Sequence, residues 1–176
     1  MLPKDYTEVP QSGGNYMKFK PGKNRFHVLS EAIIGYEYWT KDKKPVRSKT
    51  KFTSTPNIKT NDAGEPEAVK HFWAFVVYNY EDNAMQVLEL TQSSIQRAMK
   101  AKIDNREGDV TDSDFIITKS GEGLTTEYDV DIVPHKEILE EESIKEKAQE
   151  VNLAALYEGK DPFTDTTTPS VEGIPF

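Results

Sequence analysis

The chain has 176 residues, a formal net charge of −8, ten glycines, ten prolines and no cysteine. This length accommodates one domain with appendages, and the lack of cysteine excludes disulfides, thiolate metal sites and thiol catalysis. No apolar run approaches the roughly 20 residues that span a bilayer, and residues 1–10 lack the apolar core of a signal peptide, so we expect a soluble, non-exported protein.

The charge is distributed unevenly along the chain. Residues 15–59 contain eleven Lys+Arg and three acidic residues, a net charge of +8, whereas residues 60–134 have a net charge of −9 and residues 135–176 one of −6. The overall charge argues against a nucleic-acid partner, but the concentrated basic segment argues for one.

The predicted elements begin after a polar, Pro-containing stretch at residues 1–14, which we expect to be a flexible arm. Strand patterns follow at residues 24–29 and 33–40, and the second pattern is either a separate strand or the continuation of one strand bent at a bulge. Residues 41–64 are basic and rich in Thr, Ser and Pro, which is typical of a long surface loop.

The second half of the pattern pairs strands around one helix. Residues 69–80 and 85–90 predict a β-hairpin, and Thr91 is the expected N-cap of a helix of about twelve residues. Two further strands, at residues 115–118 and 124–133, are joined by a Gly-containing turn.

This order of elements predicts a mainly β fold. A parallel α/β sheet needs a helix after nearly every strand, which is not found here. Five strands with one inserted helix favour a five-stranded OB-fold-like antiparallel barrel over residues 15–134, with an SH3-like barrel or an unrelated antiparallel sheet as alternatives. We expect a helical extension at residues 135–158 and a disordered acidic tail at residues 159–176.

The sequence offers little for catalysis. The three histidines lie far apart and show no metal-ligand spacing: His27, His71 and His135. We interpret Gly121 to Gly123 as a hairpin turn, and the aspartates between residues 109 and 114 as a solvated loop rather than a magnesium site. We therefore expect no enzyme activity, no metal and no cofactor.

The residues that do suggest a function suggest binding rather than catalysis. Single-stranded nucleic acids are bound by cations that contact phosphates and by aromatic rings on which unpaired bases stack. The candidate phosphate contacts are Lys18, Lys20, Lys23, Arg25, Lys41, Lys43, Lys44, Arg47, Lys49 and Lys51. The candidate stacking residues are Tyr36, Tyr38, Trp39, Trp73 and Tyr78, of which Trp39 is the best single candidate. Residues 69–80 carry aromatic side chains on both faces, more than one barrel interior requires.

The chain ends in a hydrophobic tip on an acidic arm, formed by Ile174, Pro175 and Phe176. The last residue also carries the α-carboxylate. Such an end suits capture in an apolar pocket flanked by Lys or Arg, so we predict that the tip binds a partner protein.

Several segments together resemble a known family. They are residues 15–26, 34–39, 44–48, 72–80 and 121–124. These segments resemble single-stranded DNA-binding proteins encoded by tailed bacteriophages and prophages, and the resemblance covers about residues 15–165. It implies an OB-fold that coats and protects single strands in phage DNA replication, recombination and repair, in the cytoplasm of the bacterial host.

The tip is similar to the one by which bacterial single-stranded DNA-binding proteins recruit replication and repair enzymes. The resemblance thus implies single-stranded DNA, replication or recombination proteins and further copies of the chain on DNA as partners, and no membrane. A different class stays open, namely an interaction or regulatory module of a replication complex that does not contact DNA.

Overall fold

The structure is a computed structural model that describes residues 15–106 and 110–164. The predicted arm at residues 1–14 and the end of the predicted tail lie outside the described residues. The described residues form seven strands: β1 (Gly22–Val28), β2 (Ile33–Trp39), β3 (Pro45–Ser48), β4 (Lys70–Asn79), β5 (Ala84–Leu90), β6 (Ser113–Ser120) and β7 (Glu127–Pro134). The helices are α1 (Ser93–Asp104), α2 (Glu141–Gln149) and the short 3₁₀ helices η1 (Val110–Asp112), η2 (Gly123–Thr125) and η3 (Leu153–Glu158).

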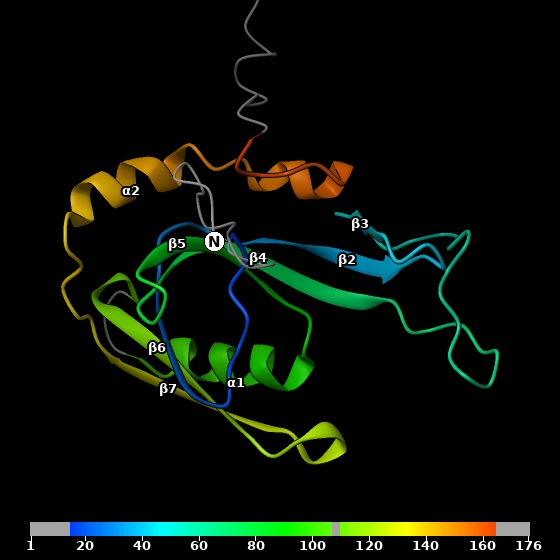
Figure 1. The fold of residues 1–176 in the computed structure, drawn as a ribbon, viewed down its shortest axis with the longest axis horizontal. Coiled ribbons are helices and arrows are strands. Elements are labelled where there is room, and N and C mark those ends of the chain that lie inside the picture. Colours follow the sequence, from blue (N-terminus) through cyan, green and yellow to red (C-terminus); the bar gives the residue numbers. More distant parts are fainter. Residues whose placement is uncertain (1–14, 107–109, 165–176) are drawn as a thin grey trace, which may run out of the picture.

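Strand β4 is the centre of an antiparallel sheet because three strands pair with it (Figure 1). Strand β5 pairs along one edge of β4, and β2 and β1 share the other edge. Strand β3 continues the sheet beyond β2, while β6 and then β7 continue it beyond β1. The mainly β prediction is confirmed.

Strands β1 and β2 follow one another along the same edge of β4. Between them, the Leu29 N–H donates to the Val76 carbonyl oxygen at 2.8 Å. The Val76 N–H donates to the Ser30 hydroxyl at 2.8 Å, because the main chain bends away from the ladder at this point. The alternative of two separate strands is thus the one that the structure adopts.

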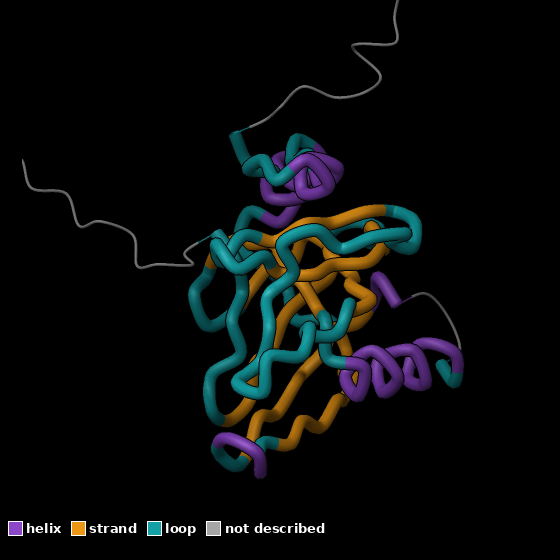
Figure 2. Tube along the Cα trace, turned by 90° about the vertical axis from the view of Figure 1, so that its right-hand side faces the viewer, coloured by secondary structure: helices purple, strands orange, loops and turns teal. Residues whose placement is uncertain are grey.

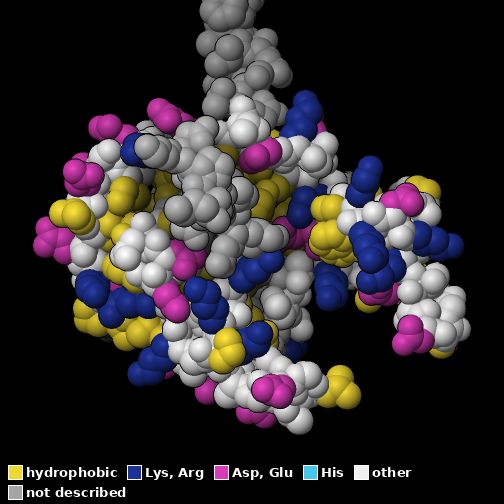
Figure 3. Space-filling view, viewed as in Figure 1, with side chains coloured by type: hydrophobic (Ala, Val, Ile, Leu, Met, Phe, Trp, Pro, Cys, Tyr) yellow, Lys and Arg dark blue, Asp and Glu magenta, His cyan; other side chains and the backbone are white. Residues whose placement is uncertain are grey.

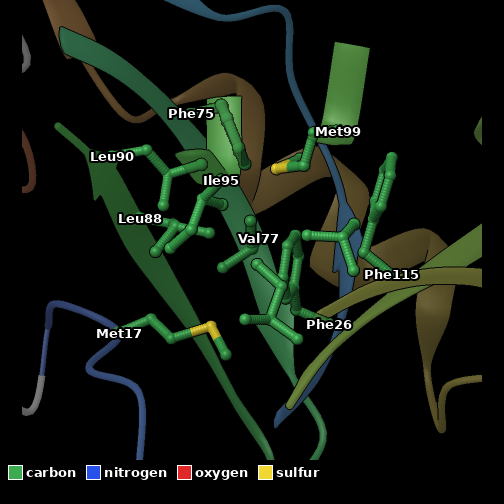
Figure 4. Packing of buried hydrophobic residues seen from close by; sticks show 11 residues of the cluster. Met17, Phe26, Phe75, Val77, Leu88, Leu90, Ile95, Met99 and Phe115 are labelled. Atoms are coloured by element: carbon green, nitrogen blue, oxygen red, sulfur yellow. The ribbon is translucent and has the colours of Figure 1, made fainter. Parts of the chain in front are cut away.

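The inner face of the sheet and α1 enclose the main hydrophobic core, shown in Figure 4. Ile95 and Met99, one helical turn apart on α1, point between the strands and are almost fully buried. They meet alternate residues of the strands, among them Phe26, Phe75, Val77, Leu88 and Phe115. Strand alternation therefore places Trp73, Phe75 and Val77 of β4 on the side of this core.

The opposite face of β4 is covered by the C-terminal extension, α2 and η3 (Figure 1). Figure 2 shows this extension and α1 on different sides of the strands. Phe72 and Val76 of β4 are fully buried against the extension's Ala148 and Leu156. The aromatic and apolar character of both faces of residues 69–80 is explained, because this strand is buried on both sides.

The chain continues in contact with the body after η3, at the start of the segment predicted to be a tail. The Asn152 N–H donates to the Pro162 carbonyl oxygen at 2.9 Å. The Phe163 ring meets the Tyr16 ring edge-on, with 6.5 Å between ring centroids. Residues 159–164 therefore pack on the extension and on the beginning of the described chain.

The predicted five-stranded barrel is wrong in strand number and in closure. Within the described residues, β5 and β7 form no hydrogen-bonded pair, so the seven-stranded sheet is open. Instead, residues 15–17 occupy the free edge of β5: the Met17 N–H donates to the Val87 carbonyl and the Val87 N–H donates to the Asn15 carbonyl, both at 2.9 Å. Helix α1 packs against β7. A neighbouring segment and a helix thus take the place of the closing strand pair.

Strand β3 lies within the stretch predicted to be a loop. Its four residues pair with the second half of β2, from Tyr36 opposite Ser48 to Trp39 opposite Pro45. A tight turn, in which Lys43 has a φ of 61° and the Thr40 N–H donates to the Lys44 carbonyl at 2.9 Å, reverses the chain between them. No helix in the described parts of the chain is long and apolar enough to cross a membrane.

The contact between the extension and β4 should contribute to global stability. Leu156→Ala removes a buried side chain from this second core, and we expect it to lower the free energy of unfolding by about 2–5 kcal/mol. Leu139→Ala is the matched control, since Leu139 is 86% exposed and its truncation should change stability by no more than about 0.5 kcal/mol. Urea unfolding of both variants measures this, and equal effects would contradict the packing described.

Candidate nucleic-acid interface

Strands β2 and β3 together with residues 49–69 form an arm that extends from the body (Figure 1). The loop part of the arm is held by backbone hydrogen bonds: the Lys59 N–H donates to the Trp39 carbonyl at 2.7 Å, and the Lys41 N–H to the Asn57 carbonyl at 2.9 Å. Gly35 permits close packing inside the arm, because a Cβ there would lie 2.3 Å from the Ser48 carbonyl oxygen. The arm is therefore an ordered part of the sheet.

One face of the arm carries a row of partly exposed aromatic and apolar side chains. Tyr36 pairs directly with His71, and Ile34 pairs with Trp73, so these four residues share a face. The Tyr36 and His71 rings lie 5.4 Å apart between centroids, and Ile34 is 55% exposed. We call these four residues, with Phe52, the aromatic face of the arm.

Two hollows adjoin the aromatic face. A hollow of about 260 Å³ is lined by Tyr36, Phe52, Val69 and Lys51, which places a cation beside two aromatic rings. A larger cavity of about 1010 Å³ includes Ile34 and Trp73 in its lining and continues along α1 towards α2. The aromatic face thus lies between two concave surfaces.

Trp39 lies on the other face of the arm. It follows Tyr38 in β2 and pairs with Pro45, so strand alternation points it away from Tyr36 and Trp73. It is 44% exposed, and its indole Nε1–H donates to the Glu37 Oε1 atom at 3.1 Å. The two tryptophans of the chain therefore lie on opposite faces of the sheet.

Arg47 pairs with Glu37 and is buried between two carboxylates. Its Nε–H donates to Glu37 Oε2 and its Nη2–H to Glu89 Oε2, each at 2.8 Å, and its side chain is 8% exposed. Nη1 also donates to the Leu156 carbonyl oxygen at 3.4 Å. This predicted phosphate contact therefore joins the arm to β5 and to the C-terminal extension.

Glu37 titrates unusually in this network. Burial raises its pKa, and so does the nearby Glu89 carboxylate, while Arg47 acts in the opposite direction; the result is a pKa of about 8. Two carboxylates share one guanidinium, so retention of a proton reduces the repulsion between them.

Two predicted stacking residues are buried. Tyr38 packs edge-on against Phe52, with 4.8 Å between ring centroids, and its hydroxyl donates to the Pro56 carbonyl at 3.2 Å. Tyr78 is 7% exposed and packs edge-on against Tyr80 at 5.1 Å. Neither presents an open ring face in the described structure, whereas Tyr36 and Trp73 are half-buried.

Most of the predicted phosphate contacts are exposed lysines. Seven of them form no ion pair within the described parts of the chain: Lys18, Lys23, Lys41, Lys43, Lys44, Lys49 and Lys51. Lys49 lies 5.5 Å above the Tyr157 ring, on the side of the extension. The unpaired lysines divide between the start of β1 and the arm.

Two basic candidates are engaged with carboxylates. Lys20 lies 3.3 Å from Asp82 and 3.7 Å from Glu81, and all three side chains are exposed. Arg25 donates to Asp114 Oδ2 at 2.8 Å and to the Pro134 carbonyl at 2.9 Å. Arg25 therefore belongs to a separate polar cluster behind β1.

The space-filling view shows how charge is distributed over the surface (Figure 3). Lys and Arg side chains gather over the arm, and acidic side chains gather at the upper left over α2. A notch separates the arm from the turn between β6 and β7, whose Leu124 is fully exposed. The arm and this turn are thus two walls of a concave surface.

Three residues of the aromatic face were not among the predicted binding residues, namely Ile34, Phe52 and His71. Alternation along residues 69–80 already placed His71 and Trp73 on one face, which is the signal that could have found His71. The predicted docking tip, Ile174 to Phe176, lies outside the described residues and stays a prediction. Comparison of the chain with protein-family models, with curated proteins and with solved structures found no match.

The buried position of Arg47 predicts a stability defect for its truncation. Arg47→Ala leaves Glu37 and Glu89 buried without their cation, and we expect it to lower the free energy of unfolding by about 3–5 kcal/mol. Lys44→Ala, on the exposed turn of the same hairpin, should change it by no more than about 0.5 kcal/mol. Chemical denaturation compares the two, and a neutral Arg47→Ala would show that the network is dispensable.

The raised pKa of Glu37 predicts a pH dependence of stability. The unfolded chain releases this proton near pH 4.5 and the folded protein releases it near pH 8. Over this window the folded state binds more protons, so the free energy of unfolding contributed by Glu37 falls as pH rises. Urea unfolding at about pH 5 and about pH 8 should show a smaller fall for Glu37→Gln than for the original chain. An identical fall would contradict the assignment.

Proposed function

We propose that this chain binds single-stranded DNA without regard to sequence. The single observation that carries the proposal is the aromatic face of the arm, where half-buried rings lie beside an unpaired lysine. Bases of any sequence stack on aromatic rings, and lysines that are not engaged with carboxylates are available to phosphates. Phage DNA replication, recombination and repair are the processes in which we propose that this activity serves.

The connectivity of the sheet supports the proposal. Strands β1 and β2, taken as one bent strand, border β4 and β6, while β5 borders β4 and β7 borders β6, with α1 inserted between β5 and β6. With β1 and β2 counted together as the first strand, we propose that this order is that of an OB-fold barrel left open between its third and fifth strands. OB-folds bind oligonucleotides between the loop that follows the first strand and the turn that joins the last two. The arm and the β6–β7 turn occupy these two positions.

The C-terminal extension limits where DNA can lie. It covers the outer face of β4, and its exposed residues include many acids, which repel phosphates. The aromatic face lies on the opposite side of the sheet, so it remains accessible. We therefore propose that the single-stranded DNA follows the notch between the arm and the β6–β7 turn.

Tryptophan fluorescence tests this path directly. In Trp39→Phe the remaining indole is Trp73 on the aromatic face, and titration with oligo(dT) should quench its emission because a base stacks near it. In Trp73→Phe the remaining indole is Trp39 on the other face, and quenching should be small. Quenching confined to Trp73→Phe would mean that the DNA binds to the opposite face of the arm. An absence of binding in either variant and in the original chain would favour the interaction module that does not contact DNA.

Removal of an aromatic ring and removal of lysine charges should affect DNA binding in different ways. Tyr36→Ala should weaken binding of any unpaired sequence by about 1–3 kcal/mol with little change in salt dependence. Joint replacement of Lys43, Lys44 and Lys51 by Ala should flatten the plot of log affinity against log salt by about 0.7 per lost phosphate contact.

The matched control for charge is Lys147→Ala, because Lys147 is an exposed lysine of α2 on the opposite side of the sheet. It should leave both the affinity and the salt dependence unchanged. Fluorescence anisotropy of a labelled oligo(dT) at several salt concentrations measures all of these variants. A slope that the lysine replacements leave unaltered would contradict phosphate binding by the arm.

A further inference from the structure

A polar cluster lies where β1 pairs with β6. The pairing of β1 with β6 brings His27 next to Asp114, although 87 positions separate them in the sequence. His135 follows the end of β7 and reaches the same carboxylate. One donor atom from each of these residues lies within 4.8 Å of the other two.

The Nδ1 atoms of both histidines lie beside the same oxygen of Asp114. Nδ1 of His27 lies 2.9 Å from Asp114 Oδ1, and Nδ1 of His135 lies 2.7 Å from the same oxygen. Ligands at about 2.0–2.2 Å from a zinc ion are themselves separated by about 3 Å, so this spacing is compatible with a shared ion. Two imidazoles and a carboxylate are donors that suit zinc and its neighbours in the first transition row.

Neighbouring groups hold two of the three donors in orientation. Asp114 uses its other oxygen, Oδ2, to accept from Arg25 Nε at 2.8 Å and from the Lys136 N–H at 3.0 Å. The second ring nitrogen of His135, Nε2, lies 2.6 Å from Glu141 Oε1. A histidine whose far nitrogen donates to a carboxylate is the usual arrangement around protein-bound metals.

The cluster is enclosed yet reachable. Asp114 has no exposed side-chain surface, and the side chains of His27 and His135 are 4% and 18% exposed. Both histidines and Glu141 line the cavity of about 1010 Å³, which gives a path for entry.

From these contacts we infer that His27, Asp114 and His135 form a binding site for a divalent transition-metal ion, with Glu141 as a positioning residue. The ion joins β1 and β6 to the segment that leads into α2. It therefore stabilises the attachment of the C-terminal extension to the sheet. The inference does not depend on DNA binding.

The test uses the full-length chain, stripped of metal by chelation and dialysed, with Zn²⁺ and Co²⁺ as probes. Calorimetric titration should show one ion bound per chain, and Co²⁺ should give a visible absorption band from nitrogen and oxygen ligands. Thermal unfolding should shift to higher temperature in the presence of either ion, because binding to the folded state stabilises it.

Variants distinguish this site from surface binding. His27→Gln and His135→Gln should abolish the stoichiometric binding and the thermal shift, whereas His71→Gln, which alters the remaining histidine, should retain both. Glu141→Gln should weaken binding by about tenfold to hundredfold, as expected for a group that orients a ligand. Circular dichroism of each metal-free variant checks that it folds.

Two results would overturn the inference. The first is an absence of stoichiometric Zn²⁺ or Co²⁺ binding by the original chain, which would leave the cluster as a hydrogen-bonded network without an ion. The second is binding that His27→Gln and His135→Gln both retain, which would locate the ion elsewhere.

Discussion

The fold depends on the burial of β4 on both of its faces. Its alternating side chains enter two different cores, one closed by α1 and the other by the C-terminal extension. Three strands also pair with it, so the sheet, the helix and the extension are all organised around this one strand. The same alternation separates two faces of the strand, because it points Trp73 towards the main core and the larger cavity and its neighbour Phe72 towards the extension.

The orientation of the arm depends on the buried guanidinium group of Arg47. Arg47 connects β3 to Glu37 of β2, to Glu89 of β5 and to the carbonyl of Leu156. A buried guanidinium with several partners specifies geometry, because any other position of the arm would leave a carboxylate unpaired. The lysines around it remain in solvent. The basic segment thus contains two arginines, Arg25 and Arg47, that are held by carboxylates, and several lysines that form no ion pair among the described residues.

The sequence predicted the elements that local patterns encode. The hairpin at residues 69–90 and the helix after it follow from alternation and helical spacing, and both were found close to their predicted bounds. Strand β3 was not predicted, because its Pro, Arg and Ser residues resemble a loop until β2 supplies their partners. The opposite orientation of Trp39 and Trp73 and the burial of Arg47 were missed for the same reason. Each depends on strand register, which links residues distant in sequence.

The polar cluster shows this limit most clearly. His27 and His135 have no recognisable spacing, and only the pairing of β6 with β1 on one side and with β7 on the other brings them to one carboxylate. Composition nevertheless predicted a segment that combines lysines with aromatic rings, and much of this segment lies in the arm. The type of a site can therefore follow from composition while its members follow from topology.

Residues 15–17 also affect the tendency of the chain to aggregate. A sheet edge with free N–H and carbonyl groups recruits strands from other molecules, and this is a common origin of aggregation. By pairing with Val87, these residues close such an edge along β5. A truncation that begins after Met17 would expose the edge and remove a side chain from the main core. By covering this edge, the segment should reduce aggregation. Shortened versions of the protein should therefore retain residues 15–17.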